Sequence, residues 1–152
     1  MLLLEISRVN LIIRKASVRW KGGAGGGRQE LTSSSGLLRR AKITFGPPPN
    51  RGSHTDPAEL IAIAHASSFS LALSKELKLK PSAAGEIVTT ATVTLDHLAA
   101  GWTIVNIHLN VTAMLPKVTQ VRFIDATVRA ETSSLVCRLI RATISMSTRL
   151  TK

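Results

Sequence analysis

Ser68 and His65 are the residues of this sequence whose types and spacing could supply a nucleophile and its base. They are three residues apart, so both side chains share one face if the segment is helical. The neighbouring residues lack the G-x-S-x-G turn that exposes a hydrolase serine, and a mid-helix position has no evident oxyanion donors. We therefore interpret His65 as a hydrogen-bonded core residue and expect no hydrolase activity.

The other residues with metal-binding or redox chemistry are scattered. The four histidines, His54, His65, His97 and His108, show no metal-ligand spacing, and neither a CxxC nor an HExxH motif is present. We expect no metal and no cofactor. Cys137 is the single cysteine, which excludes an internal disulfide, and its simplest interpretation is a small buried apolar residue.

Composition narrows the class of protein. The 152 residues carry 20 Lys+Arg against 9 Asp+Glu, a net charge of +11, but no run of five basic residues occurs. Aromatic residues make up only 3 %, too few for the stacking platforms of single-strand binders, so we expect a solvated basic surface and no specific nucleic-acid partner. No apolar run is long enough for a membrane helix, and the N-terminal residues make a poor signal peptide. A single domain over 1–152 and a cytoplasmic location are the expectation.

Apolar periodicity predicts the elements that position these residues. Strands are expected over Val9–Trp20, Ile87–Leu95, Thr103–Ala113 and Ala142–Leu150, and one or two further strands lie within Leu31–Thr44. Helices are expected over Pro57–Leu77 and Val118–Glu131, and Ser133 or Ser134 caps a short helical stretch after them. Loops are expected at Gly22–Gly27 and Pro47–Gly52. The order predicts an α+β fold with antiparallel sheet and no βαβ repeat.

The two predicted helices differ in their apolar faces. Asp56, Pro57 and Glu59 form a helix start, with an N-cap acceptor, a proline at the first position and a glutamate at the third. The helix over Pro57–Leu77 is apolar or small on most faces, which predicts burial nearly all round. A lone domain of this size would leave part of it uncovered, so the pattern predicts an obligate homodimer. In the second helix, a single stripe holds the large apolar residues Val121, Ile124 and Val128.

The segment from His54 to Ser74 resembles the central helix of the OsmC/Ohr family, the osmotically inducible and organic-hydroperoxide-resistance proteins. It reads HTDPAELIAIAHASSFSLALS, against an approximate family pattern of T-N-P-E-E-L-I-x-A-A-H-A-A-C-F-S-M-A-L. Segments Arg19–Gly22, Ser35–Leu37 and Leu95–Trp102, and the tail after Ser134, agree in order and spacing. The resemblance is closer to the OsmC branch and leaves residues 1–15 as an atypical N-terminal extension.

The resemblance implies antiparallel sheets wrapped around two central helices in an intertwined homodimer, with sites at the subunit interface. It also implies reduction of organic hydroperoxides by two cysteines. A peroxidatic thiolate attacks the O–O bond, a resolving cysteine forms a disulfide with it, and a dithiol reductant resets the pair. An arginine and a glutamate beside the reactive thiol keep it deprotonated and oriented.

All four family positions carry other residues in this chain. The peroxidatic cysteine falls on Ser68 and the resolving cysteine on Ser134. The glutamate falls on Ala58 and the loop arginine on Pro48, with Arg51 as a possible substitute three residues later. We expect Ala58, Ser68 and Ser134, with Arg51 or an arginine of the other subunit, to line one apolar cavity, in which the two hydroxyls lie within about 10 Å of each other.

The missing thiols decide the expected activity. A serine hydroxyl is not ionised near neutral pH and forms no sulfenate, so we expect no thiol-dependent peroxidase activity. Cys137 follows Ser134 by one helical turn, and a displaced thiol there would need an external reductant. Two hypotheses stay open. In the first, the chain is a hydroperoxide reductase that acts with a dithiol reductant, and its cysteines are written as serine through engineering or error. In the second, it is a natural non-catalytic member that binds a small hydrophobic ligand. The absence of the family's glutamate and arginine favours the second hypothesis.

Overall fold

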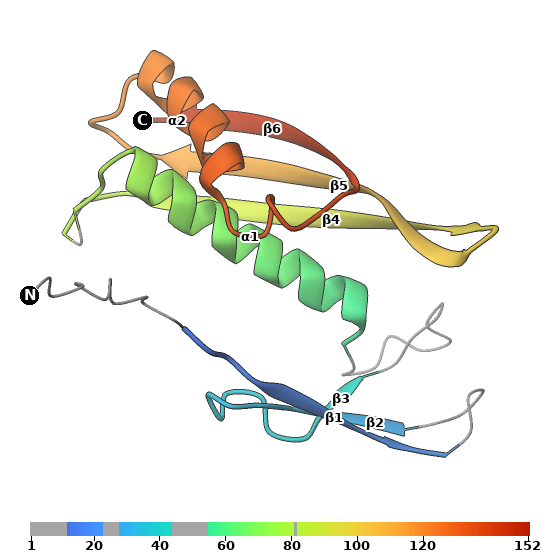
Figure 1. Ribbon diagram of the computed structural model, residues 1–152. Coiled ribbons are helices and arrows are strands. Elements are labelled where there is room, and N and C mark those ends of the chain that lie inside the picture. The colour runs from blue at the N-terminus through green and yellow to red at the C-terminus, as the bar shows by residue number, and fades with distance from the viewer. Residues whose placement is uncertain (1–11, 23–27, 44–54, 81) are drawn as a thin grey trace, which may run out of the picture. The chain divides into compact units, whose positions relative to one another are not determined.

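The computed structural model describes residues 12–22, 28–43, 55–80 and 82–152, which form two helices and two three-stranded sheets (Figure 1). The elements in chain order are β1 (Ala16–Lys21), β2 (Arg28–Ser33), β3 (Ala41–Ile43), α1 (Pro57–Glu76), β4 (Glu86–Leu98), β5 (Gly101–Met114), α2 (Gln120–Ser133) and β6 (Thr143–Thr151). They divide into two compact units, Met1–Asp56 and Pro57–Lys152, and the single domain expected over 1–152 stays a prediction. Neither described helix is long and apolar enough to cross a membrane.

The first unit is an antiparallel sheet in the order β1-β2-β3. Ala16 pairs with Ser33 and Lys21 with Arg28, so the hairpin predicted around the glycine-rich segment is confirmed. Gly22 begins that connection at a φ of 102°, a conformation that glycine adopts without a steric penalty. β1 begins at Ala16, later than predicted, and the proline-rich loop Pro47–Gly52 lies outside the described residues.

The second unit contains a mixed sheet in the order β4-β5-β6. β4 and β5 form the long antiparallel hairpin that their alternating residues predict. β6 pairs with β5 in parallel, from Asn106 opposite Thr143 to Met114 opposite Thr151. The prediction of antiparallel sheet was therefore wrong for β6, which follows β5 through one crossover; the described strands contain no repeated βαβ units.

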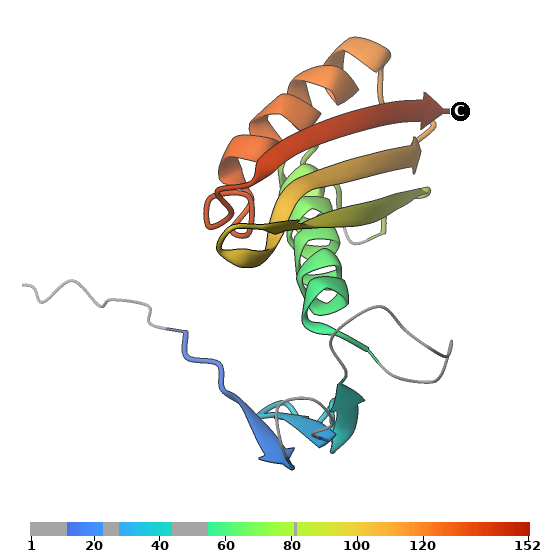
Figure 2. The same ribbon diagram turned by 90° about the vertical axis from the view of Figure 1, so that its right-hand side faces the viewer.

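The direction of β6 follows from α2 and not from its own residues. Alternation of apolar and polar residues is the same for parallel and antiparallel strands, so it carries no information about direction. A parallel neighbour requires a long crossover connection, and α2 supplies it by carrying the chain back along the sheet (Figure 2).

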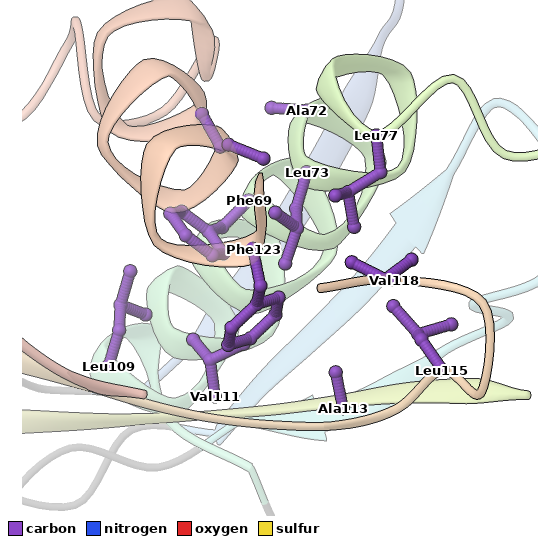
Figure 3. Close-up of a cluster of buried hydrophobic side chains, with 12 residues drawn as sticks. Phe69, Ala72, Leu73, Leu77, Leu109, Val111, Ala113, Leu115, Val118 and Phe123 are labelled. Atoms are coloured by element: carbon purple, nitrogen blue, oxygen red, sulfur yellow. The ribbon is translucent and has the colours of Figure 1, made fainter. Parts of the chain in front are cut away.

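The core of the second unit lies between the two helices and one face of this sheet. Figure 3 shows Phe69 and Leu73 of α1 and Phe123 of α2 pointing toward Leu109 and Val111 of β5. These five side chains are fully buried. Alternate residues of β5 point into the core because successive side chains of a strand face opposite sides of the sheet.

α1 begins at Pro57 as predicted and ends at Glu76. In the single chain Ile63 and Leu71 are 59 % and 56 % exposed, so burial nearly all round, which was expected in a homodimer, stays a prediction. Within the second unit, the sheet and α2 contact the side of α1 that carries Phe69 and Leu73.

The stripe of α2 that was singled out from the sequence also faces away from the core. Val121, Ile124 and Val128 are exposed, whereas Phe123 and Ala126 on the other side of the helix are fully buried. After α2, residues 135–139 form turns, so the short helical stretch predicted there was wrong. Ser134 is instead the C-cap of α2, and its N–H donates to the carbonyl of Ala130.

Candidate functional site

Two serines from different helices meet in the second unit. Ser68 lies in the middle of α1 and Ser134 at the end of α2, and their Oγ atoms are 2.9 Å apart. The backbone N–H of Val136 donates to Ser68 Oγ at 3.2 Å. Ser134 is 1 % exposed, so its hydroxyl depends on protein partners for hydrogen bonding. The expected proximity of the two hydroxyls, within about 10 Å, is confirmed.

A histidine and the single cysteine form a second contact one turn away. His65 Nε2 lies 3.1 Å from Cys137 Sγ. His65 precedes Ser68 by three residues and Cys137 follows Ser134 by three, so each contact joins the same two segments. The Ser68 hydroxyl thus accepts from Val136 N–H and can donate to Ser134 Oγ.

Burial keeps the histidine and the cysteine uncharged. Removal from water raises the pKa of the Cys137 thiol, and this effect outweighs the opposing hydrogen bond from Ser134. The same desolvation lowers the pKa of His65. The pair at neutral pH is therefore a thiol beside a neutral imidazole, in contrast to the thiolate and imidazolium of an activated cysteine.

The nucleophile and base pair that we considered for hydrolysis is not formed. His65 Nε2 contacts Cys137, while the Ser68 hydroxyl contacts Ser134 and the N–H of Val136. His65 Nδ1 is buried and has no hydrogen-bond partner among the described residues. The described residues also contain no group of three or more His, Cys, Asp or Glu side chains arranged to hold a metal ion.

The remaining residues of the predicted site lie apart from the serine pair or outside the described residues. Ala58 is buried in the first turn of α1, ten residues before Ser68, which corresponds to about 15 Å along the helix axis. Arg51 and Pro48 are outside the described residues. The shared cavity predicted for Ala58, Ser68 and Ser134 stays a prediction.

An apolar cavity of about 390 Å³ adjoins the serine pair. It is lined by Ile61, Ala64, Ile104, Ile107, Val136, Leu139, Ile140, Arg141 and Ala142. Val136 links the two features, since its N–H donates to Ser68 while the residue lines the cavity. Arg141 is the one charged residue of the lining. The sequence analysis did not identify Val136 or Arg141 as site residues. It also missed the His65–Cys137 contact, although His65 and Cys137 each lie three residues from a serine of the pair.

Comparison with known proteins identifies the family. Residues 50–149 match the family model described as OsmC-like protein. The chain belongs to the OsmC-like protein family. It is 30 % identical over 139 residues to Peroxiredoxin OsmC of Escherichia coli (strain K12), a match that covers 91 % of this chain and 97 % of that protein.

Solved structures of the OsmC type share the fold at lower identity. An OsmC-like protein of unknown function from Vibrio cholerae has a TM-score of 0.74 at 13 % identity, with 91 % of this chain and 99 % of that chain covered. An organic hydroperoxide resistance protein from the same species, with captopril bound in one of its active sites, has a TM-score of 0.62 at 17 % identity, with 95 % and 94 % covered. The resemblance to the OsmC/Ohr family read from the helix motif is confirmed.

Proposed function

We propose that this OsmC-family protein does not carry out the two-cysteine reduction of hydroperoxides and instead binds a small organic molecule beside the serine pair. The observation that carries the proposal is the 2.9 Å contact between the Ser68 and Ser134 hydroxyls. The resemblance aligns these positions with the family's two thiols, and two hydroxyls form neither a sulfenate nor a disulfide. With Cys137 as the only cysteine, no intramolecular disulfide can replace that step.

The lining of the adjoining cavity supports a ligand that is mainly apolar and carries one negative charge. Its volume of about 390 Å³ lies in the range of small-molecule sites. Eight of the nine lining residues are aliphatic, and the ninth, Arg141, is exposed, so we propose that its guanidinium meets a ligand carboxylate at the solvent-facing edge of the cavity.

Two measurements test the proposal. In a coupled assay with dithiothreitol and cumene hydroperoxide, we expect no turnover above background, with Peroxiredoxin OsmC of Escherichia coli as the positive control. In calorimetric titrations, we expect captopril and medium-chain carboxylates to bind and Arg141→Gln to weaken them by about tenfold. Arg138→Gln is the matched control, because it removes one exposed positive charge outside the cavity lining. Substantial turnover of the hydroperoxide, or an affinity for the ligand that Arg141→Gln leaves unchanged, contradicts the proposal.

A second candidate function rests on the 3.1 Å contact between His65 and Cys137. In a one-cysteine cycle, the Cys137 thiolate attacks the distal oxygen of the hydroperoxide, the O–O bond breaks, and a proton converts the leaving alkoxide to an alcohol. The resulting sulfenic acid then needs two external thiol equivalents, which leave as a disulfide with one water. The raised pKa of Cys137 disfavours the thiolate that starts this cycle. Peroxidase activity that Cys137→Ser abolishes would establish it.

We also propose that the chain is a homodimer. Ile63 and Leu71 on α1 and Val121, Ile124 and Val128 on α2 are large apolar residues exposed in the single chain. Exposed apolar area of this kind marks an association surface. Light scattering at micromolar concentration should give twice the mass of the chain, and a monomer would contradict the proposal. The cytoplasmic location stays a prediction.

A further inference from the structure

A second cavity lies where α1 ends and α2 begins, at the opposite end of α2 from the serine pair. Its volume is about 460 Å³. α2 contains 14 residues, which places the cavity about 20 Å from Ser134. The site is therefore separate from the one described above.

Four cationic residues line this cavity, and none of its lining residues is acidic. Lys78 and Lys80 follow α1, Lys117 precedes α2, and Arg122 lies in the first turn of α2. The first turn of α2 has no acidic side chain to offset the positive end of the helix dipole. The lining of the cavity is therefore positively charged, and its four cationic side chains are exposed to solvent.

The contacts of Arg122 and of the nearby Glu76 do not neutralise these cations. Arg122 donates from one guanidinium nitrogen to the backbone carbonyl of Leu77, which uses one of its five N–H donors. Glu76, the adjacent carboxylate on α1, is engaged by Arg129 at 2.9 Å and by Ser133 at 3.2 Å. Within the described residues, the ion pairs are Arg129–Glu76 and Arg40–Glu30, so neither uses a cation of this cavity.

The other part of the lining is apolar. Leu77, Leu79, Leu115 and Val118 contribute to it. Leu77 is fully buried and belongs to the hydrophobic core, so this wall rests on the packed interior. A ligand that matches the whole cavity carries several negative charges and an apolar portion.

We propose that this cavity binds a small soluble organic phosphate, such as a nucleoside diphosphate. Lys78, Lys80, Lys117 and Arg122 contact the phosphate oxygens, and the apolar part of the ligand packs against the leucine and valine wall. Four like charges around one cavity repel each other, and a bound polyanion removes that repulsion. The site also gives a role to part of the net charge of +11.

Titration calorimetry of the full chain with ADP tests the site, at about 50 mM and about 150 mM salt. We expect saturable one-to-one binding per chain that weakens with salt. Lys80→Gln and Lys117→Gln should each lower the affinity about fivefold, and the double variant at least tenfold. Arg138→Gln is the matched control, because it removes one exposed positive charge outside the cavity and should change the affinity less than twofold.

Comparison ligands separate this site from diffuse charge effects. Inorganic pyrophosphate should bind more weakly than ADP, because it lacks the part that contacts the apolar wall. An equal loss of affinity in Arg138→Gln, equal affinity for pyrophosphate and ADP, or binding to anionic phospholipid vesicles with none to ADP would each overturn the proposal. Unchanged circular dichroism of the variants shows that any loss is local. The outcome does not depend on the ligand or activity of the serine site.

Discussion

His65 Nε2 lies 3.1 Å from Cys137 Sγ, and burial favours the neutral form of both groups. The contact joins residues 72 positions apart, one turn from the Ser68–Ser134 contact. Together these contacts attach the end of α2 and the following turns to the middle of α1. They place the single thiol of the chain in a buried site that disfavours its thiolate form. Because the thiolate is the reactive form, the thiol is a weak nucleophile there.

The hydroxyl pair contributes to stability. Ser68→Ala leaves the buried Ser134 hydroxyl without that partner and removes the acceptor of the Val136 N–H. We expect the free energy of unfolding to fall by about 1–3 kcal/mol, measured by urea denaturation. Ser68→Ala combined with Ser134→Ala should cost less than the sum of the two single changes, because both remove the same hydrogen bond. Strict additivity would show that the two hydroxyls act independently.

Restoring thiols at the serine positions should restore part of the redox chemistry. In a Cys137→Ser background, Ser68→Cys with Ser134→Cys should form an intramolecular disulfide on mild oxidation, seen as the loss of two hydrogens in the intact mass. Turnover of hydroperoxide should be slow, because Ala58 still stands at the family's glutamate position.

Ser68→Cys by itself is the control for that experiment. In the Cys137→Ser background it should oxidise once and stop, or gain further oxygen atoms, because it has no resolving thiol. Sustained turnover by this single variant would contradict the role assigned to position 134.

The buried histidine predicts a pH dependence of stability. The pKa of His65 is lowered in the folded chain, so below its ordinary value of 6.5 the unfolded chain binds a proton that the folded chain resists. The free energy of unfolding should therefore fall as the pH decreases through about 6.5. His65→Gln should flatten this slope, whereas His97→Gln, at an exposed position, should keep it. Equal slopes in both variants would contradict the assignment.

The two faces of α2 should differ sharply in their tolerance of substitution. Phe123 is fully buried in the core, so Phe123→Ala should lower the free energy of unfolding by about 3–5 kcal/mol. Asp125, two residues later, is exposed and outside the apolar stripe proposed for the dimer, and Asp125→Ala should change the free energy of unfolding by less than about 0.5 kcal/mol. Thermal or denaturant unfolding of both variants measures the contrast, and similar losses would contradict the orientation of α2.

Several elements could be predicted because their signal is local. The start of α1 at Pro57 is encoded by an N-cap acceptor, a first-turn proline and a glutamate within four residues. The alternation along β4 and β5 likewise identified a hairpin with a short turn. The helix motif also indicated the OsmC family and thereby pointed to Ser68 and Ser134.

What the sequence by itself determined is therefore the identity and periodicity of the elements, the family, and the absence of a second thiol. Only the tertiary structure decided that β6 runs parallel to β5, that His65 meets Cys137, and that four cations surround one cavity. Periodicity shows which side of a helix or strand is apolar. It is the same whether a strand runs parallel or antiparallel to the next strand, and whichever element packs against it. Contacts between residues far apart in the chain depend on how the helices pack on the sheet, and no local pattern contains that information.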